Sequence, residues 1–507
     1  MMQPGFYPKP PDKVTHTETH ISHIFFAGDL VFKVKKPVRF SFLDYSTLSK
    51  RRFFLNEELR LNRRLAPSVY IGVVPITCDQ SGWRLGGWGE PAEYGLVMRR
   101  LPERRMLPFL LETNQTTTEM MRELAVVLAR FHREATRVDA SEARQYFQKV
   151  AQEWRDNLND LSSLTEGVSG REPHDEFARW GEKFLRANQA LIDQRAEQGW
   201  VRDVHGDLHC EHVCFAPEGV EIFDCIEFDP ALRRCDLAAE IAFLVMDLEV
   251  RNGATFAGQF LERYLEIVND PEQTKLLDFF KCYRALVRAK VYALRGAQGF
   301  SQAEKYFRYA ERFLWRHTVL VVVCGLTGSG KSTLARELGS SLGWPVFNSD
   351  VIRKQMTGVT GRHLAAVDES IYSPVMTSKT YAKLLREAEK SIAKGSGAIL
   401  DATFARREQR ESVLRMARKH NLPVFFIHCE ASAETTRARL AQRNAVGRDI
   451  SDGRWAVYEK QLARADAMND IPELIRLDLN TDAPLSELIT RCKQFLRLHT
   501  HDLTNPS

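Results

Sequence analysis

Residues 319–333 read VLVVVCGLTGSGKST, in which a β-branched apolar run leads directly into a GxxxxGKS loop. The run predicts a buried strand, and LARELGSSLG after the loop predicts a helix. Glycines let successive backbone N–H groups turn inward on one phosphate, and the helix N-terminus adds its positive dipole end. Lys331 then reaches the β- and γ-phosphates and the Ser332 hydroxyl is placed to hold Mg²⁺, so the stretch predicts a nucleoside triphosphate site. The residues expected to contact the nucleotide are Gly325, Thr327, Gly328, Ser329, Gly330, Lys331, Ser332 and Thr333.

The composition is that of an ordinary globular chain with more than one domain. Its 507 residues are 44% hydrophobic and 27% charged, enough apolar content for sizeable cores. The net charge of +5 is mild; it permits a nucleic-acid partner but does not indicate one. The first residues, MMQPGFYPKPPDK, lack the apolar core of a signal peptide, and no apolar run is long enough for a membrane span. Nine unpaired-looking cysteines suit a reducing compartment, so we expect a cytoplasmic location and no membrane partner.

The pattern of the chain changes near residue 316, which predicts domains at 1–316 and 317–507. In the second domain, buried strands alternate with helices, at WPVFNSD, GAILDAT, PVFFIHC and LIRLDL after the first strand. Such alternation predicts an α/β fold with a parallel sheet covered on both faces. The first domain opens with strands up to about residue 100 and continues mainly as helices, with a short β segment around 201–228.

An acidic and a basic residue follow the second strand of the C-terminal domain. The sequence there reads Asn348-Ser349-Asp350, with Arg353 one helical turn later. Ligands of open α/β sheets bind beyond the carboxyl ends of the strands, so Asp350 is expected beside the phosphate loop. A carboxylate there can accept the proton of an attacking hydroxyl, and Arg353 can hold the acceptor. The alternative is that Asp350 only caps the following helix.

Two further features of the C-terminal domain carry charge toward the predicted site. Asp401 ends the strand GAILDAT, where P-loop enzymes commonly keep an acidic residue that orients Mg²⁺ or its water shell. Arg439 and Arg443 lie at i, i+4 spacing on one helical face and could neutralise charge developing in transfer. Arg448 and Arg454 follow them in a looser segment, and a solvated surface is the alternative for all of these arginines.

Residues 318–498 resemble the P-loop small kinases with AAA-type ATP binding, a group that includes gluconate kinase, chloramphenicol phosphotransferase, zeta toxins and 5′-hydroxyl polynucleotide kinases. The resemblance rests on GLTGSGKST, NSDVIRK and the arginine-bearing segment. It implies transfer of the γ-phosphate of ATP to a hydroxyl, with Asp350 as base and ATP and Mg²⁺ as the bound species. The acceptor stays open: a small molecule is favoured, and a nucleic-acid 5′ end is the main rival.

A second set of acidic residues lies in the N-terminal domain, around a predicted hairpin. HGDLHCEH at 205–212 precedes a turn at Pro217-Glu218-Gly219, and IFDCIEFD follows at 222–229. The hairpin would bring Asp207 and Asp224 to one end, an arrangement suited to catalysis and metal binding. The histidines and cysteines of the first stretch lack the paired spacing of a zinc site, which we therefore do not predict.

Residues 20–300 resemble the aminoglycoside phosphotransferase and protein-kinase-like fold, on the strength of HGDLH and the later Asp motifs. The resemblance implies an α+β domain of two lobes, in which Asp207 is the catalytic base and Asp224 binds Mg²⁺. It also implies that Asp236 braces the catalytic loop. Lys33, in the alternating strand LVFKVKK, is expected to hold the α- and β-phosphates, with Lys35 as competitor. Its ion-pair partner is expected to be Glu57 or the adjacent Glu58 in FFLNEELRLNRRL, and we favour Glu57.

One residue departs from the resembled pattern. The family has Asn five residues after the catalytic Asp, whereas this chain has His212. Imidazole replaces the hard oxygen ligand that Mg²⁺ prefers, so the N-terminal domain is either a second kinase or a regulatory domain. The whole chain is then expected to be a bifunctional phosphotransferase, with an ATP-hydrolysing regulatory module as the alternative. Transfer of label to an acceptor distinguishes the two.

Overall fold

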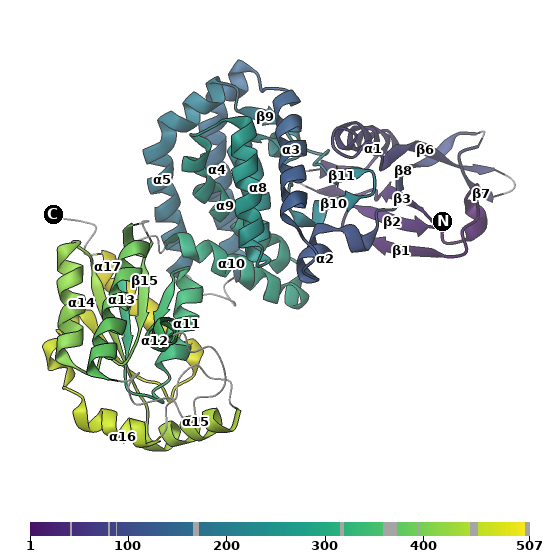
Figure 1. Ribbon diagram of the computed structural model, residues 1–507. Helices are drawn as coiled ribbons and strands as arrows, with labels where there is room; N and C mark the ends of the chain where they lie inside the picture. The colour runs from purple at the N-terminus through teal and green to yellow at the C-terminus, as the bar shows by residue number, and fades with distance from the viewer. Residues whose placement is uncertain are drawn as a thin grey trace. The chain divides into compact units, whose positions relative to one another are not determined.

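The computed structural model describes residues 1–40, 43–79, 82–87, 89–165, 172–314, 319–357, 373–393, 396–446 and 455–501. The chain divides into two compact units, Met1–Ala310 and Glu311–Ser507, called here the N-terminal and the C-terminal unit. The division falls six residues before the boundary expected from the sequence. Figure 1 shows a region rich in strands and then a helical region in the N-terminal unit, and alternating helices and strands in the C-terminal unit.

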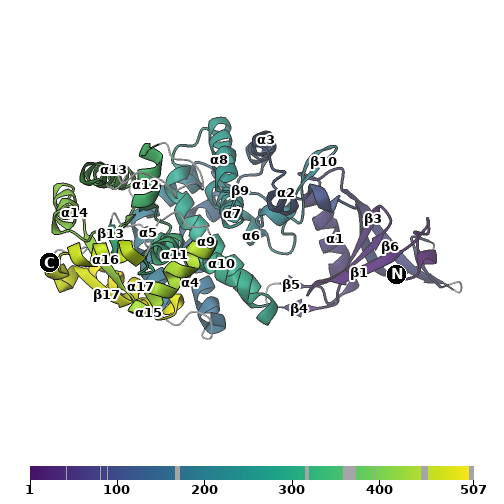
Figure 2. The same cartoon turned by 60° about the horizontal axis from the view of Figure 1, so that its bottom comes forward.

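The N-terminal unit begins with a six-stranded antiparallel sheet in the order β1-β2-β3-β8-β6-β7. Alternating apolar positions give the sheet one buried face, where Phe32, Val34, Ile76 and Val97 pack together. Helix α1 packs on β6 and β8 through Leu55 (Figure 2). The elements are β1 (Val14–Glu18), β2 (Ser22–Ala27), β3 (Leu30–Lys35), β4 (Arg39–Phe40), β5 (Leu43–Asp44), α1 (Leu48–Asn62), β6 (Tyr70–Asp79), β7 (Gly82–Leu85) and β8 (Pro91–Arg99).

A helical region follows and holds two short β pairs. Helix α7 is buried almost throughout and packs against α8 and α9, so it forms the centre of this region. Strands β10 and β11 form the hairpin predicted around Pro217-Glu218-Gly219. The helices are α2 (Leu107–Glu112), α3 (Thr118–Glu134), α4 (Ala140–Thr165), α5 (Glu172–Glu197), α6 (Pro230–Arg233), α7 (Leu237–Val250), α8 (Ala254–Val268), α9 (Gln273–Ala293) and α10 (Phe300–Leu314). The strands are β9 (Val201–Asp203), β10 (Val213–Ala216), β11 (Gly219–Ile222) and β12 (Arg234–Asp236).

The C-terminal unit contains a five-stranded parallel sheet in the order β14-β15-β13-β16-β17. The predicted alternation of strand and helix is therefore confirmed. The strands are β13 (Leu320–Cys324), β14 (Val346–Asn348), β15 (Ala398–Asp401), β16 (Val424–Glu430) and β17 (Arg476–Asn480). The helices are α11 (Lys331–Leu342), α12 (Ser349–Thr357), α13 (Pro374–Ala393), α14 (Arg407–Lys419), α15 (Ala433–Val446), α16 (Trp455–Arg464) and α17 (Leu485–His501).

Strand β13 is buried on both sides, and its side chains alternate between two cores. Leu320 and Val322 belong to the core that Leu384 of α13 and Val413 of α14 complete. On the opposite face, α11 and α17 cover the sheet with a second apolar cluster that includes Val321 of β13. Because both faces are covered, ligands can reach the sheet only beyond its ends.

Among the described helices, none combines the length and the apolar character that crossing a bilayer requires.

Candidate active sites

The loop between β13 and α11 has the backbone conformation of a phosphate cradle. Gly325, Gly328 and Gly330 all have positive φ, at 139°, 81° and 81°. A Cβ atom at Gly325 would lie 2.3 Å from the carbonyl oxygen of Cys429, so no larger residue fits there. The loop ends where α11 begins at Lys331, which places the predicted anion-binding amides at a helix N-terminus.

The predicted metal ligands of this unit lie together at the end of the sheet. Asp401 is buried, and its Oδ2 accepts a hydrogen bond from Asn348 at 2.6 Å. Its Oδ1 has no hydrogen-bond partner within the part of the chain that the structure describes. Burial raises the pKa of Asp401, while the charge of Lys331 and hydrogen bonds from Asn348 and Ser332 act in the opposite direction. A buried carboxylate oxygen beside the Ser332 hydroxyl is a donor set that fits Mg²⁺.

Asp350 faces a basic partner and does not cap its helix. The cap of α12 is Asn348, whose Oδ1 accepts from the backbone N–H groups of Asp350 and Val351 at 2.9 and 3.0 Å. The Asp350 carboxylate instead accepts from Arg353 at 2.7 Å, and the Arg353 side chain is buried. The capping alternative is therefore wrong.

Arg439 and Arg443, the two arginines predicted on one helical face, both lie on α15. Arg439 is partly buried and donates to the hydroxyl and the carbonyl oxygen of Thr481, at 3.0 and 2.7 Å. The Thr481 hydroxyl in turn donates to the carbonyl oxygen of Ser329 in the phosphate loop at 2.7 Å. Arg439 therefore supports the loop through Thr481. Arg443 lies on α15, but its side chain is outside the described residues, as are Arg448 and Arg454.

The sequence indicated neither the contact of Thr481 with the loop nor a further contact from α16. The side chain of Gln461, on α16, accepts a hydrogen bond from the backbone N–H of Thr327 at 2.9 Å. Its position carries no motif, and 134 residues separate the two partners, so no local pattern could have indicated it.

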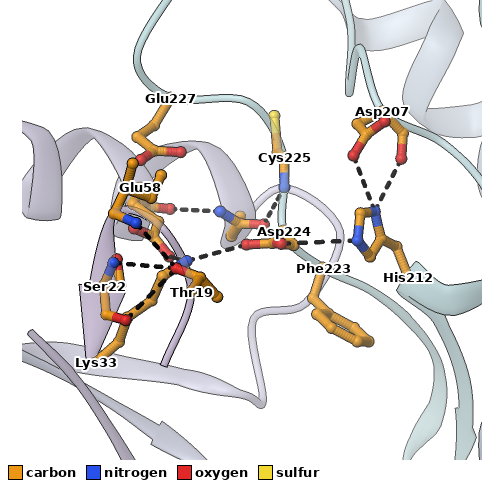
Figure 3. Close-up of polar contacts among 12 residues, drawn as sticks. Thr19, Ser22, Lys33, Glu58, Asp207, His212, Phe223, Asp224, Cys225 and Glu227 are labelled. Carbon is orange, nitrogen blue, oxygen red and sulfur yellow. Dashed lines mark hydrogen bonds and ion pairs between the residues drawn. The ribbon is translucent and has the colours of Figure 1, made fainter. Parts of the chain in front are cut away.

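In the N-terminal unit, Asp207 and Asp224 lie just before and just after the β10–β11 hairpin, and His212 lies between them (Figure 3). The His212 Nδ1 is 2.9 Å from the carbonyl oxygen of Asp207, and its Nε2 is 3.6 Å from Oδ2 of Asp224. The two carboxylates expected from the sequence thus lie close together. His212, which stands where the resembled family has Asn, lies between them.

Lys33 of β3 completes this cluster from the sheet. Its ammonium group lies 2.7 Å from Glu58 and 3.1 Å from Asp224. The partner on α1 is therefore Glu58 and the choice of Glu57 is wrong, because the half-buried Glu57 pairs with Arg60 at 2.7 Å. Lys35, the competitor of Lys33, is fully buried between Glu58 and Glu227, at 2.9 and 2.5 Å.

Asp224 is held in a costly backbone conformation. Its φ of 63° lies in the left-handed region, and its N–H donates to the Tyr70 hydroxyl at 3.2 Å. Such a conformation costs on the order of 1 kcal/mol and persists where surrounding contacts enforce it. The Lys33 ammonium lowers the pKa of Asp224 below its usual value, which keeps the carboxylate ionised.

Glu58 allows a test of this cluster with an adjacent control. We expect Glu58→Gln to destabilise the N-terminal unit by about 3 kcal/mol or more, because two lysines, one fully buried, lose their shared counter-charge. Glu57→Gln removes only a solvent-accessible pair and should change stability by less than about 0.5 kcal/mol. Differential scanning calorimetry measures both, with the unfolding of the C-terminal unit as internal reference. Equal effects of the two substitutions would contradict the assignment.

The loop that carries Asp207 is braced by a residue one helical turn from the expected one. Glu240 accepts from the backbone N–H groups of His205 and Gly206, at 2.8 and 3.1 Å. Asp236, the expected brace, instead caps α7 through Ala238 and forms a buried ion pair with Arg195. Asp236 is the N-cap of α7 and Glu240 lies one helical turn later, so the expectation that Asp236 braces the loop is wrong by four residues.

Burial raises the pKa of Glu240 to about 7. A carboxyl with a raised folded-state pKa stabilises the fold fully below its unfolded pKa and loses that contribution as pH rises through the folded value. Between about pH 4.5 and 7, wild type should therefore lose up to about 3 kcal/mol relative to Glu240→Gln, which does not titrate. Calorimetric scans of both proteins at pH 5 and pH 8 check this, and parallel pH profiles would contradict it.

Comparison with known proteins supplies the class of the chain. The family model described as phosphotransferase enzyme family matches residues 38–277, and the AAA domain model matches residues 320–468. Both regions are kinase domains, so the protein is an ATP-dependent kinase with an aminoglycoside-phosphotransferase-like domain followed by a P-loop kinase domain.

The relatives define the family more narrowly. An uncharacterized protein of Mycobacterium tuberculosis is 30% identical over 433 residues, which cover 84% of this chain and 85% of the mycobacterial protein. The chain belongs to the same family as that protein. Gluconokinase of Gluconobacter oxydans is 28% identical over 176 residues, or 33% of this chain and 88% of the gluconokinase.

Solved structures also resemble parts of the chain. A sugar kinase from Janibacter sp. has 23% identity and a TM-score of 0.28, with coverage of 36% of this chain and 95% of that chain. A choline/ethanolamine kinase family protein from Mesorhizobium loti has 14% identity and a TM-score of 0.35, with coverage of 61% and 89%.

Proposed function

We propose that the protein is a bifunctional phosphotransferase whose C-terminal unit transfers the γ-phosphate of ATP to a hydroxyl group of a small molecule. The observation that carries the proposal is the pair formed by Asp350 and Arg353 at the end of β14, joined through Asn348 to Asp401 beside the phosphate loop. The groups proposed as proton acceptor, acceptor-binding cation and metal-binding carboxylate lie at one end of the sheet. The similarity to a gluconokinase favours a polyhydroxy acceptor.

In this mechanism the acceptor oxygen forms a bond to the γ-phosphorus as the bond to the β–γ bridging oxygen breaks, and ADP leaves. Asp350 takes the hydroxyl proton. Arg353 orients the carboxylate of Asp350 or binds an anionic group of the acceptor. Lys331 and the loop amides hold the phosphates, and Arg439 keeps the loop in place through Thr481. Ser332 and Asp401 would hold Mg²⁺, which neutralises charge on the phosphate oxygens when bound.

For the N-terminal unit we propose a second phosphotransferase site built from Lys33, Asp207 and Asp224. Lys33 would hold the nucleotide phosphates, Asp224 a metal ion, and Asp207 the proton of a second acceptor. The ion pairs of Lys33 with Glu58 and Asp224 support this assignment, because they align the groups that a kinase site requires. A regulatory domain is the alternative.

Product identification tests both halves of the proposal. Full-length wild type, Lys331→Ala and Asp207→Ala are incubated with labelled ATP and a metabolite extract, and the compounds that gain phosphate are identified. A bifunctional enzyme should lose one set of products in each variant. Phosphate release with no labelled acceptor would overturn the proposal in favour of an ATP-hydrolysing module, and labelling of an added 5′-hydroxyl oligonucleotide alone would replace the small-molecule acceptor.

A further inference from the structure

The N-terminal site has a ligand set that does not fit Mg²⁺. Asp207, His209 and His212 can each offer one atom such that all of these atoms lie within 4.8 Å of one another. Neither Cys210 nor Cys214 belongs to the group. Mg²⁺ prefers oxygen ligands, whereas imidazole suits softer divalent ions such as Zn²⁺ and carboxylates also suit Mn²⁺.

The hydrogen bonding of His212 fixes which nitrogen is available to a metal. A carbonyl oxygen only accepts, so the 2.9 Å contact with the carbonyl of Asp207 places the imidazole proton on Nδ1. In the neutral ring, Nε2 then carries the free lone pair. A hydrogen bond from Nδ1 to a backbone carbonyl is also the usual support of a metal-bound histidine.

The lone pair of Nε2 faces a carboxylate oxygen and not a hydrogen-bond donor. Nε2 lies 3.6 Å from Oδ2 of Asp224, so two electron-pair donors point at each other with a gap between them (Figure 3). Two ligand atoms about 2.1 Å from one ion lie roughly 3 to 4 Å apart, which this gap matches. Lys33 contacts the other oxygen, Oδ1 of Asp224, and leaves Oδ2 available.

The neighbouring His209 is already engaged. Its Nε2 lies 3.3 Å from a guanidinium nitrogen of Arg288, which can only donate, so Nε2 is the acceptor of that contact. This cation disfavours a metal ion on His209. The residue is therefore excluded from the ligand set and serves as a matched control.

We propose that Nε2 of His212 and Oδ2 of Asp224 bind a divalent ion of borderline softness, Mn²⁺ or Zn²⁺, in preference to Mg²⁺. Asp207 lies at the opposite ring nitrogen, Nδ1, and stays the proposed proton acceptor. The ion takes the place next to the predicted nucleotide phosphates where the resembled family uses Asn and Asp. The inference does not depend on catalysis by either unit, because the ligand atoms are arranged without nucleotide.

The test uses untagged full-length protein with Mn²⁺ and without nucleotide. Electron spin echo spectroscopy detects nitrogen bound to Mn²⁺, and the predicted metal ligands of the C-terminal unit, Ser332 and Asp401, offer only oxygen. We expect nitrogen coupling in wild type and in His209→Gln, and its loss in His212→Asn. We also expect Mn²⁺ to bind at least about tenfold more weakly to His212→Asn.

Two results would overturn the proposal: no nitrogen coupling in wild type, or the same coupling in His212→Asn. The second result would point to another histidine cluster, such as His16 and His23 with Glu18. Competition between Mg²⁺ and Mn²⁺ on wild type needs no variant. A tenfold excess of Mg²⁺ should leave the nitrogen coupling in place, and loss of that coupling would overturn the proposed preference over Mg²⁺. Differential scanning calorimetry that retains the unfolding transition of the N-terminal unit shows that each variant is folded.

Discussion

Lys331→Ala should remove ATP binding from the C-terminal unit and with it all transfer by that unit. Lys331 is the first residue of α11, and its ammonium group lies 3.4 Å from the carbonyl oxygen of Leu326, across the phosphate loop. Lys331 is expected to reach both the β- and the γ-phosphate, and each hydrogen bond to a charged group contributes about 1.5–3 kcal/mol. Their loss weakens binding roughly 10²- to 10⁴-fold and takes the site out of the range of the titration. Isothermal titration calorimetry with Mg·ATP should then show one fewer binding site per chain.

The control for this substitution is Lys390→Ala, which removes an exposed ion pair with Glu387 in the same unit. It should leave the ATP titration unchanged. Unchanged stoichiometry and retained transfer in Lys331→Ala would remove the basis of the nucleotide site.

Asp350→Asn should preserve ATP binding and lower kcat of the C-terminal transfer by roughly 10²- to 10⁴-fold, the usual contribution of a positioned proton acceptor. The amide keeps the shape of the side chain and its contact with Arg353 but cannot take the hydroxyl proton. Steady-state kinetics and an ATP titration of the same preparation separate the two effects, because only kcat should change.

The exposed Asp478, which pairs with His428 and Arg476, provides a matched acidic control. Asp478→Asn should have normal kcat. A kcat for Asp350→Asn within a few-fold of wild type would mean that the proton goes elsewhere and that Asp350 only orients Arg353.

The sequence predicted the C-terminal unit well because its determinants are local. The phosphate loop needs glycines, a lysine and a serine at fixed spacing between a strand and a helix, and all of these lie within residues 319–333. The parallel sheet follows from alternating buried strands and helices. Asp401 follows from the strand that it ends, and Asp350 from its place two residues after β14. Each step uses neighbours in the chain.

What the sequence did not predict depends on the rotation of a helix or on distant partners. Glu57 and Glu58 are adjacent, about 100° apart around α1, and only packing against the sheet decides which one meets Lys33. Glu240 and Asp236 share one face of α7, so periodicity cannot rank them. The contact of Gln461 with the phosphate loop joins residues far apart in the chain.

Position 348 requires a side chain that accepts and donates hydrogen bonds in two directions. The oxygen of Asn348 serves two amides of α12, while its nitrogen serves the carboxylate of Asp401. Aspartate would lose the donor and set two negative charges side by side, and serine has one polar atom for two directions. The proposed base and the proposed metal carboxylate are therefore positioned by the same side chain, and mutational tolerance at Asn348 should be among the narrowest in the unit.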